Sequence, residues 1–352
     1  MKWALFVFVQ LIIFHPFGLT AQMQIRDTCY KDAYENLSQL LIQEEKNSFK
    51  KAVFLTENAF LQGSLSYKDF ENSISNLLPF IKSWMKSNPA RDYPEEDSLF
   101  VKETGAVFSV MRDTIEIKFS DGNEKKHYPF TYDFDDFEGA ADWTNTFVTK
   151  LLVSGSGNCH SLPYLYKILA DELDVPNSWL SFAPNHIYIK NYCKKIGWYN
   201  TELTSGEFPV DAWIMASGYI SPDAVRNGIY MDTLSNREAV ANCMLDLAKG
   251  YERKYRAYTD SFIIKCCDWV LKYQPLNINA IIYKAETLKK MYLIDKSQNP
   301  ALAAKIYSDM ENLYVHALDL GYKEMPEKMY REWLLSVVKE KEKYNNQQVE
   351  KR

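Results

Sequence analysis

The stretch GSGNCHSLPYLYKILADEL, residues 155–173, leads from a glycine-rich loop directly into an apolar helical pattern. Leu162, Tyr166 and Leu169 recur at helical spacing, which predicts a helix over residues 159–173 with one buried face. We expect that face to press against a sheet formed by the strands that follow. Cys159 would then stand at the junction of loop and helix, on the buried side.

Three short strands are predicted after this helix, SWLSF, HIYIK and WYNTEL, beginning at residues 178, 186 and 198. The last two form a hairpin, which we expect to be centred on Lys194 and to pair residue 190 with 198 and residue 186 with 202. In that register His186 faces Glu202, and strand alternation puts Trp198 and Asn200 on the face of Glu202. The sequence therefore predicts an imidazole beside a carboxylate, provided that the register does not slip by one residue.

Most of the remaining chain is predicted to be helical. Apolar residues recur at helical spacing over residues 28–85 and beyond residue 235, where breaks fall near Pro275, Pro300 and Pro326. Between these regions we expect a loop over residues 87–97, a hairpin turning at residues 121–122, and a helix over residues 142–152. The stretch DWVLKYQPLNINAIIYKAETL has the helix, Pro, Asn-x-x-Ala, helix layout of a tetratricopeptide repeat, which predicts a degenerate helical-repeat tail.

The charge balance and the N-terminal sequence restrict the partners and the compartment. Lys and Arg number 41 against 46 Asp and Glu, a net charge of −5, whereas a nucleic-acid-binding surface needs a basic excess. The start MKWALFVFVQLIIFHPFGLTAQ, with Lys2, an apolar run and a small residue at Ala21, is typical of a signal peptide covering residues 1–21. An uncleaved anchor is the alternative, but the run is short for a membrane span. We expect a periplasmic or secreted protein, with no nucleic-acid partner and no stable membrane span after cleavage.

Six cysteines would reach that oxidising compartment, but their irregular spacing, without a C-x-x-C pair, does not indicate a disulfide scaffold. Cys159 remains open to four interpretations: a nucleophile, a metal ligand, half of a disulfide with Cys193, or a buried sulfur. A zinc site of Cys159, His160, His186 and Cys193 matches no common zinc spacing, and neighbouring ligands at a helix start point apart. His160 is expected at the surface or just behind the site.

Asn158 is predicted to cap the helix, which places Cys159 at the first helical position, where unpaired N–H groups and the helix dipole favour a thiolate. Cleavage of an amide or ester needs a thiolate, a histidine that moves the proton and an acid that orients the histidine. Cys159, His186 and Glu202 can fill these roles. The backbone N–H of Cys159 would supply one oxyanion-hole donor.

The segments GSGNCHSLPYLYKILADEL, NHIYIK and GWYNTELTSG resemble, in this order, the Cys, His and acid boxes of the transglutaminase-like (papain-related) cysteine superfamily. A bacterial branch that joins this domain to tetratricopeptide-type helices is more similar still, through AVFLTENAFLQGSLSYKDF and GNCHSL, and the resemblance spans roughly residues 51–275. Trp198 leads a strand that resembles the acid box. Glu202 stands where the family has Asp, which makes Asn200 a candidate substitute.

The resemblance implies an α+β fold with a transglutaminase-like core. The predicted organisation is a signal peptide (1–21), a helical N-terminal region (22–100), the transglutaminase-like domain (101–235), a helical-repeat region (236–345) and a disordered tail (346–352). It further implies a cysteine hydrolase or acyltransferase that acts on a protein or peptide through a thioester, with no metal or organic cofactor. The alternative is a catalytically silent scaffold that binds a peptide or protein partner through its C-terminal helices.

Overall fold

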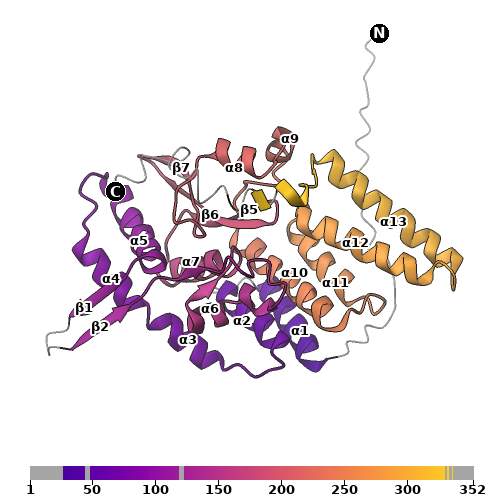
Figure 1. The fold of residues 1–352 in the computed structure, drawn as a ribbon, viewed down its shortest axis with the longest axis horizontal. Helices are drawn as coiled ribbons and strands as arrows, with labels where there is room; N and C mark the ends of the chain where they lie inside the picture. Colours follow the sequence, from indigo (N-terminus) through magenta and orange to yellow (C-terminus); the bar gives the residue numbers. More distant parts are fainter. Residues whose placement is uncertain (1–26, 44–47, 119–122, 330, 333–334, 336–352) are drawn as a thin grey trace, which may run out of the picture.

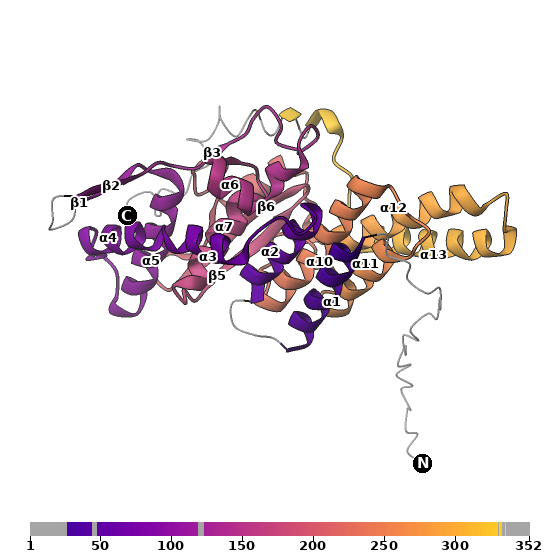
Figure 2. The ribbon, with the colours of Figure 1, turned by 90° about the horizontal axis from the view of Figure 1, so that it is seen from below.

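The computed structural model describes residues 27–43, 48–118, 123–329, 331–332 and 335. Helices and small sheets are mixed along the chain, which confirms the predicted α+β class. The molecule is elongated, with the hairpin of β1 (Ile115–Lys118) and β2 (Glu124–His127) at one end and helices α12 (Ile278–Asp295) and α13 (Pro300–Asp319) at the other (Figures 1 and 2). The predicted signal peptide, the C-terminal tail and the turn at residues 121–122 lie outside the described residues.

Helices from both ends of the chain form one layer, which consists of α1 (Thr28–Gln43), α2 (Ser48–Phe60), α10 (Asn236–Tyr255) and α11 (Phe262–Tyr273). Tyr30 on α1 meets Tyr251 on α10 edge-on, with ring centroids 5.2 Å apart. A capping box starts α10, because the Ser235 side chain accepts the N–H of Glu238 and the Glu238 side chain accepts the N–H of Ser235. The N-terminal and C-terminal helices therefore share one core.

Helix α7 (Ser161–Glu172) lies between this layer and a three-stranded antiparallel sheet, as Figure 1 shows. All residues from 161 to 170 are buried, because strands of the sheet and the helices α5 (Glu95–Arg112) and α6 (Val148–Ser154) pack against α7. On the helical side, Phe49 of α2 packs edge-on against Tyr164 at 5.0 Å. The strands β5 (Ser178–Ala183), β6 (His186–Cys193) and β7 (Gly197–Thr201) are the three that the sequence predicts.

The register of the β6–β7 hairpin differs from the predicted one. Lys190 pairs with Asn200, whereas the sequence pattern predicted a pair with residue 198. The pairing is thus displaced by two residues. Because side chains alternate with a period of two, this displacement leaves His186 and Glu202 on the same face, although they are no longer directly opposite.

The turn between β6 and β7 accounts for the displacement. Cys193 pairs with Gly197, so the turn is centred on Lys195, one residue beyond the predicted Lys194. Gly197 has a φ of +82°, a left-handed conformation that glycine adopts without strain. Asp97, distant in sequence, accepts hydrogen bonds from the N–H groups of Lys194 (3.0 Å) and Lys195 (2.8 Å). A tertiary contact therefore helps to set this register.

The predicted helix over residues 142–152 is divided in two, η1 (Trp143–Thr146) and α6 (Val148–Ser154). Glu57 causes the break, because its buried carboxylate accepts the N–H groups of Val148 (2.7 Å) and Thr149 (2.9 Å) and so starts a new helix. The remaining short elements are α3 (Tyr67–Ser75), α4 (Leu78–Ser87), β3 (Thr131–Tyr132), β4 (Ser156–Gly157), α8 (Asp211–Ser217) and α9 (Pro222–Arg226).

A long helix, α5 (Glu95–Arg112), was not predicted and begins inside the predicted loop over residues 87–97. The acids at 95–97 that indicated a loop form the first turn of this helix, directly after Pro94, where they complement the helix dipole. α5 packs against α4 and α7 and reaches the sheet. The predicted domain boundary near residue 100 falls within it.

The helices predicted beyond residue 235 are confirmed, together with their breaks near Pro275, Pro300 and Pro326. The last of these is a non-helical stretch over residues 322–326. Pro275 separates α11 from α12, and Pro300 occupies the first turn of α13, where Asn299 caps the helix by accepting the N–H of Leu302. None of the helices in the described part of the chain is long and apolar enough to cross a bilayer.

Candidate active site

Cys159, His186 and Glu202 lie together where the start of α7 meets the sheet. The Nε2 atom of His186 is 2.5 Å from Oε2 of Glu202, and the Sγ atom of Cys159 is 3.9 Å from the carbonyl oxygen of Asn185, next to His186. The three residues are 8%, 5% and 5% exposed, respectively. The fold therefore brings together the three residues that sequence analysis selected.

His186 and Glu202 form a buried ion pair. Burial by itself lowers the pKa of His186, but the charge of Glu202 and the hydrogen bonds with Cys159 and Glu202 outweigh it and raise that pKa to about 10. Burial by itself raises the pKa of Glu202, but the charge of His186 and the hydrogen bonds from His186 and Thr204 bring it below its ordinary value. The pairing thus favours a cationic ring and an ionised carboxylate. A cationic ring beside a thiol favours the thiolate.

The imidazole of His186 has a different partner for each nitrogen. Nε2 is bonded to Glu202, so Nδ1 is the nitrogen available for proton exchange with Cys159. The hydrogen bond with Cys159 is one of the causes that raise the pKa of His186. Transfer of the thiol proton to the ring yields a thiolate beside an imidazolium, which is the division of roles that a nucleophile, a base and an orienting acid require.

Cys159 lies in the turn before α7 and not at the first helical position that was predicted, because α7 begins at Ser161. The N-cap position belongs to His160, so the predicted cap, Asn158, lies two residues before it. The Oδ1 atom of Asn158 still accepts hydrogen bonds from the N–H groups of His160 (2.9 Å) and Ser161 (3.2 Å), and its carbonyl accepts the N–H of Leu162 (3.1 Å). The cysteine is therefore held at the positive end of the helix dipole by the capping turn itself.

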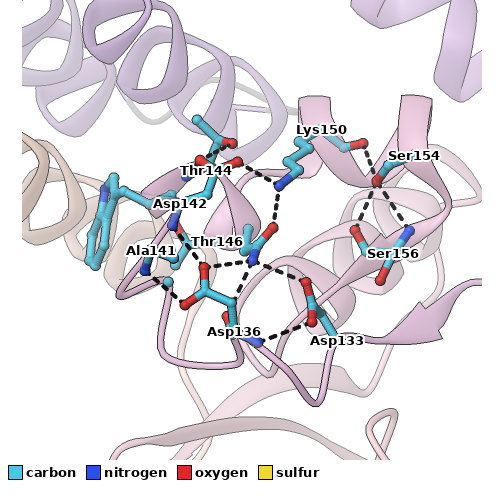
Figure 3. A network of polar contacts seen from close by, with 12 residues as sticks. Asp133, Asp136, Ala141, Asp142, Thr144, Thr146, Lys150, Ser154 and Ser156 are labelled. Atoms are coloured by element: carbon cyan, nitrogen blue, oxygen red, sulfur yellow. Dashed lines mark hydrogen bonds and ion pairs between the residues drawn. The ribbon is translucent and has the colours of Figure 1, made fainter.

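An acidic loop, residues 133–147, lies against this turn, and Figure 3 shows how its carboxylates are engaged. The side-chain amide of Asn145 donates to Asp133 (3.1 Å) and to Asp136 (3.0 Å). Asp136 also accepts the N–H groups of Ala141 (2.9 Å) and Asp142 (2.8 Å). The Asp133 and Asp136 carboxylates thus make hydrogen bonds within the loop and stiffen it.

Side-chain hydrogen bonds connect the acidic loop to the capping turn. The Ser161 hydroxyl donates to the carbonyl of Asn145 at 3.0 Å and accepts the N–H of Asn158 at 3.0 Å, and the Asn158 amide donates to the carbonyl of Phe137 at 2.9 Å. Gly157 packs so closely that a Cβ there would lie 2.3 Å from the Ser161 hydroxyl. The backbone of the candidate nucleophile is therefore fixed from both sides.

Thr204 orients Glu202 and was not predicted as a site residue. Its N–H (2.9 Å) and its hydroxyl (2.8 Å) both donate to Oε1 of Glu202, which leaves Oε2 for His186. The sequence signal that could have identified it is the Glu-x-Thr spacing, since short polar side chains at this separation often bond to one another locally.

Two other predicted site residues lie away from the imidazole. The side-chain amide of Asn200 donates to the carbonyl of Pro209 (2.9 Å) and to Asp211 (2.7 Å), at the start of α8. Trp198 is 52% exposed and packs against Trp179, with ring centroids 5.6 Å apart. Glu202, and not its proposed substitute Asn200, is therefore the residue that the fold brings to His186.

His160 ties the capping turn to the helical layer. Its Nδ1 lies 2.9 Å from the carbonyl oxygen of Thr146 and its Nε2 lies 3.1 Å from Asp246 of α10. The ring also packs against Tyr164 at 4.0 Å. His160 and Glu57 line a small cavity of about 50 Å³ behind the site. His160 thus acts as a structural support behind Cys159.

The disulfide and metal-ligand roles for Cys159 find no support in the geometry of the described residues, whereas its burial also fits that of a core sulfur. All six cysteines lie in described parts of the chain and are free thiols. Cys193 ends β6 at the opposite end from His186, a separation of about 23 Å at the usual rise per strand residue. Within the described ranges, no group of three or more His, Cys, Asp or Glu residues is arranged to hold a metal ion. Cys193 therefore lies far from the end of β6 where Cys159 meets His186.

A larger pocket, of about 320 Å³, lies between the segment 226–234 and the joint of α11 and α12. Its lining includes Phe182 of β5, Arg226, Asp232 and Gln274. Segment 226–234 thus forms a wall where the sheet meets the C-terminal helices. Its backbone also extends the sheet, because the N–H of Met231 donates to the carbonyl of Phe182 at 2.8 Å.

No family model matches the sequence, and no curated protein matches it either. Among solved structures, the chain is similar to the crystal structure of menin that reveals the binding site for the Mixed Lineage Leukemia (MLL) protein. That similarity covers 90% of this chain and 89% of menin at 9% sequence identity, with a TM-score of 0.32. A likeness at this level does not establish a common fold.

Proposed function

We propose that this protein is an exported cysteine enzyme with a transglutaminase-like core, which forms a thioester with an amide substrate in a protein or peptide. The observation that carries the proposal is the arrangement of Cys159, His186 and Glu202, with an ion pair that raises the pKa of His186. A structural cysteine does not need a buried, cationic imidazole beside it, whereas a nucleophile does. Export rests on the N-terminal sequence alone.

In the first half of the reaction, the thiolate of Cys159 attacks the amide carbon, and the carbonyl oxygen becomes an oxyanion. The backbone N–H of Cys159 is the candidate donor for that oxyanion. The C–N bond then breaks, and the imidazolium of His186 gives its proton to the leaving amine. The products are the thioester on Cys159, the free amine and a neutral imidazole.

In the second half, His186 removes a proton from the acceptor, which attacks the thioester carbon. Water as acceptor releases a carboxylic acid, and an amine as acceptor releases a new amide. Either route restores the thiolate and the imidazolium. Throughout the cycle, Glu202 keeps Nε2 protonated and holds the ring in place.

The proposal is tested by alkylation of the folded protein with iodoacetamide, followed residue by residue with mass spectrometry between pH 5 and 9. Cys29 provides an internal control: it is half-buried, and burial together with Asp27 raises its pKa. We expect Cys159 to be labelled rapidly at pH 6, where Cys29 is not. Equal, slow labelling of both residues below about pH 8, where an ordinary thiol is mostly protonated, would refute the proposal.

Hydrolysis and transfer are distinguished by a second assay. Dimethylated casein is incubated with the protein in the presence of a biotinylated primary amine, and a Cys159→Ala variant is the control. Cleaved casein without biotin identifies a hydrolase, whereas biotinylated casein identifies an acyltransferase. We expect hydrolysis, because the resemblance to the bacterial branch favours it.

The pocket beside segment 226–234 favours a second candidate function, that of a binding module. This pocket lies where the sheet meets the C-terminal helices, and Cys159, His186 and Glu202 are not among its lining residues. A scaffold would bind a peptide there whether or not Cys159 is present. Peptide binding that is unchanged in Cys159→Ala, together with an unreactive thiol, would support this alternative.

A further inference from the structure

One arginine from α5 holds the turn that carries Glu202. This turn, residues 202–207, is called here the acid turn. The guanidinium of Arg112 donates one hydrogen bond to the carbonyl of Leu203 (3.1 Å) and another to the carbonyl of Ser205 (3.3 Å). Arg112 is thus connected to a segment 91 and 93 residues further along the chain.

The acid turn is closed by its own backbone. The N–H of Glu202 donates to the carbonyl of Glu207 (2.8 Å), and the N–H groups of Gly206 (2.9 Å) and Glu207 (3.1 Å) donate back to the carbonyl of Glu202. The carbonyls of Leu203 and Ser205 are the ones that accept from Arg112. The guanidinium therefore completes the hydrogen bonding of a turn whose first residue is the candidate acid.

Gly206 lets the guanidinium approach this closely. Its φ is +75°, and a Cβ at this position would lie 2.6 Å from Nε and 2.8 Å from Nη2 of Arg112. Any other residue would push the arginine away or change the shape of the turn. The backbone of the acid turn is therefore packed directly on the guanidinium.

The charge of Arg112 also acts on the acid turn. Burial lowers the pKa of Arg112, and the neighbouring carboxylates of Asp113, Glu207 and Glu202 act in the opposite direction without fully compensating. The same attraction, seen from Glu202, stabilises its ionised form. Complementing the dipole at the C-terminus of α5 does not by itself explain these contacts. A cation with only that role would bond to the last carbonyls of its own helix, whereas Arg112 bonds to the acid turn.

We propose that Arg112 is a positioning residue for the catalytic trio: it holds the acid turn so that one oxygen of Glu202 meets His186 while the other stays on Thr204. The inference rests on the proposed function, because it assigns Arg112 a role through Glu202. Arg112 does not contact the reacting atoms. It acts on them by fixing the orientation of the acid that fixes the base.

The test compares Arg112→Met, Arg112→Lys and a control, Arg237→Met. Arg237 is another partly buried arginine, on α10, where it stacks on Tyr273 away from the trio. Two quantities are measured in full-length mature protein: the rate of iodoacetamide labelling of Cys159 at pH 6, and the charge state of His186 by NMR with 15N-labelled histidine. Thermal unfolding is recorded alongside as a measure of folding.

We expect Arg112→Met to slow labelling of Cys159 about tenfold, the loss typical of a misplaced catalytic group, and to lower the pH at which His186 loses its charge. Arg112→Lys should recover part of both effects, because it keeps the charge and one donor. Arg237→Met should change neither. If Arg112→Met does not fold, Arg112→Lys provides the test. A labelling rate of Cys159 and a titration of His186 that both equal those of the wild type in Arg112→Lys would contradict the proposal.

The outcomes separate this inference from the proposed function. If labelling of Cys159 in the wild-type protein is slow and has the pH dependence of an ordinary thiol, the proposed function itself is refuted. Fast labelling in the wild type that persists in a folded Arg112→Met variant refutes only the role of Arg112. A fall in thermal stability with an unchanged His186 titration would also refute it, because a purely structural arginine behaves in that way.

Discussion

Replacement of Glu202 by glutamine removes the charge of the acid and leaves its shape nearly unchanged. Oε1 of the amide can still accept both hydrogen bonds from Thr204. The NH₂ group, however, takes the place of the oxygen that lies 2.5 Å from Nε2 of His186. An amide NH₂ group donates hydrogen bonds and does not accept them, so Nε2 must accept a hydrogen bond from it. The neutral ring then carries its proton on Nδ1. His186 then cannot take the proton of Cys159.

The expected loss of reactivity follows from the ionisation of an ordinary thiol. A thiol with a pKa near 8.5 is ionised to about 0.3% at pH 6. A cysteine paired with an imidazolium exists almost completely as the thiolate at pH 6, although such a thiolate is intrinsically less nucleophilic than that of an ordinary thiol. We therefore expect Glu202→Gln to slow labelling of Cys159 at pH 6 by about 10- to 100-fold. The difference should shrink as the pH approaches 9.

The same variant should lose stability in a defined pH window. In the unfolded chain, Glu202 has a pKa of about 4.3 and His186 a pKa of about 6.5. Because folding lowers the pKa of Glu202, this residue stabilises the fold at pH values above about 4.3. Because folding raises the pKa of His186, that residue stabilises the fold fully at pH values below about 6.5. Between these values both contributions are complete, and we expect Glu202→Gln to lose about 2–4 kcal/mol. As the pH rises from 6.5 towards the folded pKa of about 10, the contribution of His186 is lost.

Urea unfolding at pH 5.5 and pH 8.5 measures this free energy, with Glu207→Gln as a matched control on the same turn. We expect Glu202→Gln to lose more free energy of unfolding at pH 5.5 than at pH 8.5. A loss that is independent of pH, or a labelling rate equal to that of the wild type at pH 6, would show that His186 and Glu202 do not form the ion pair described above.

Three further substitutions, and a matched control at Gly155, test the supports of the site. Gly157→Ala should destabilise by about 1–3 kcal/mol through the clash with Ser161 and slow labelling of Cys159, whereas Gly155→Ala, with φ +72° but nothing within 4 Å, should cost only about 1 kcal/mol in chemical unfolding. Asp97→Ala should lose about 2–3 kcal/mol in the same assay, because two N–H groups of the β6–β7 turn lose a buried acceptor. Thr204→Ala should slow labelling about threefold to tenfold, since Glu202 is then free to turn away from His186. An unchanged labelling rate in Gly157→Ala or Thr204→Ala would remove that residue from the account.

The local pattern was sufficient to select Cys159, His186 and Glu202. Strand alternation placed the histidine and the acid on one face, and a two-residue error in register did not separate them because the alternation has a period of two. Helical spacing placed the cysteine beside the sheet. The position of Cys159 relative to the helix was wrong by one or two residues, which is the usual uncertainty of a helix end.

The supports of the site could not be predicted, because they depend on contacts distant in sequence. Arg112 belongs to a helix whose acidic first turn resembles a loop, and its partners lie about ninety residues later. Glu57 divides a helix that its own residues would continue. Neither contact leaves a periodic trace in the sequence. Both become visible only when the chain is folded and the hydrogen bonds of each buried N–H and C=O group are counted.

If His186 converts Cys159 into a nucleophile, loss of the imidazole must slow alkylation of the thiol. The measurement to make is the rate of iodoacetamide labelling of Cys159 at pH 6 in the wild type and in His186→Ala. We expect rapid labelling in the wild type and a fall of at least about tenfold in the variant, with Cys29 unaffected in both. Equal rates in the two folded proteins would contradict this role of His186 and would identify Cys159 as an ordinary core cysteine.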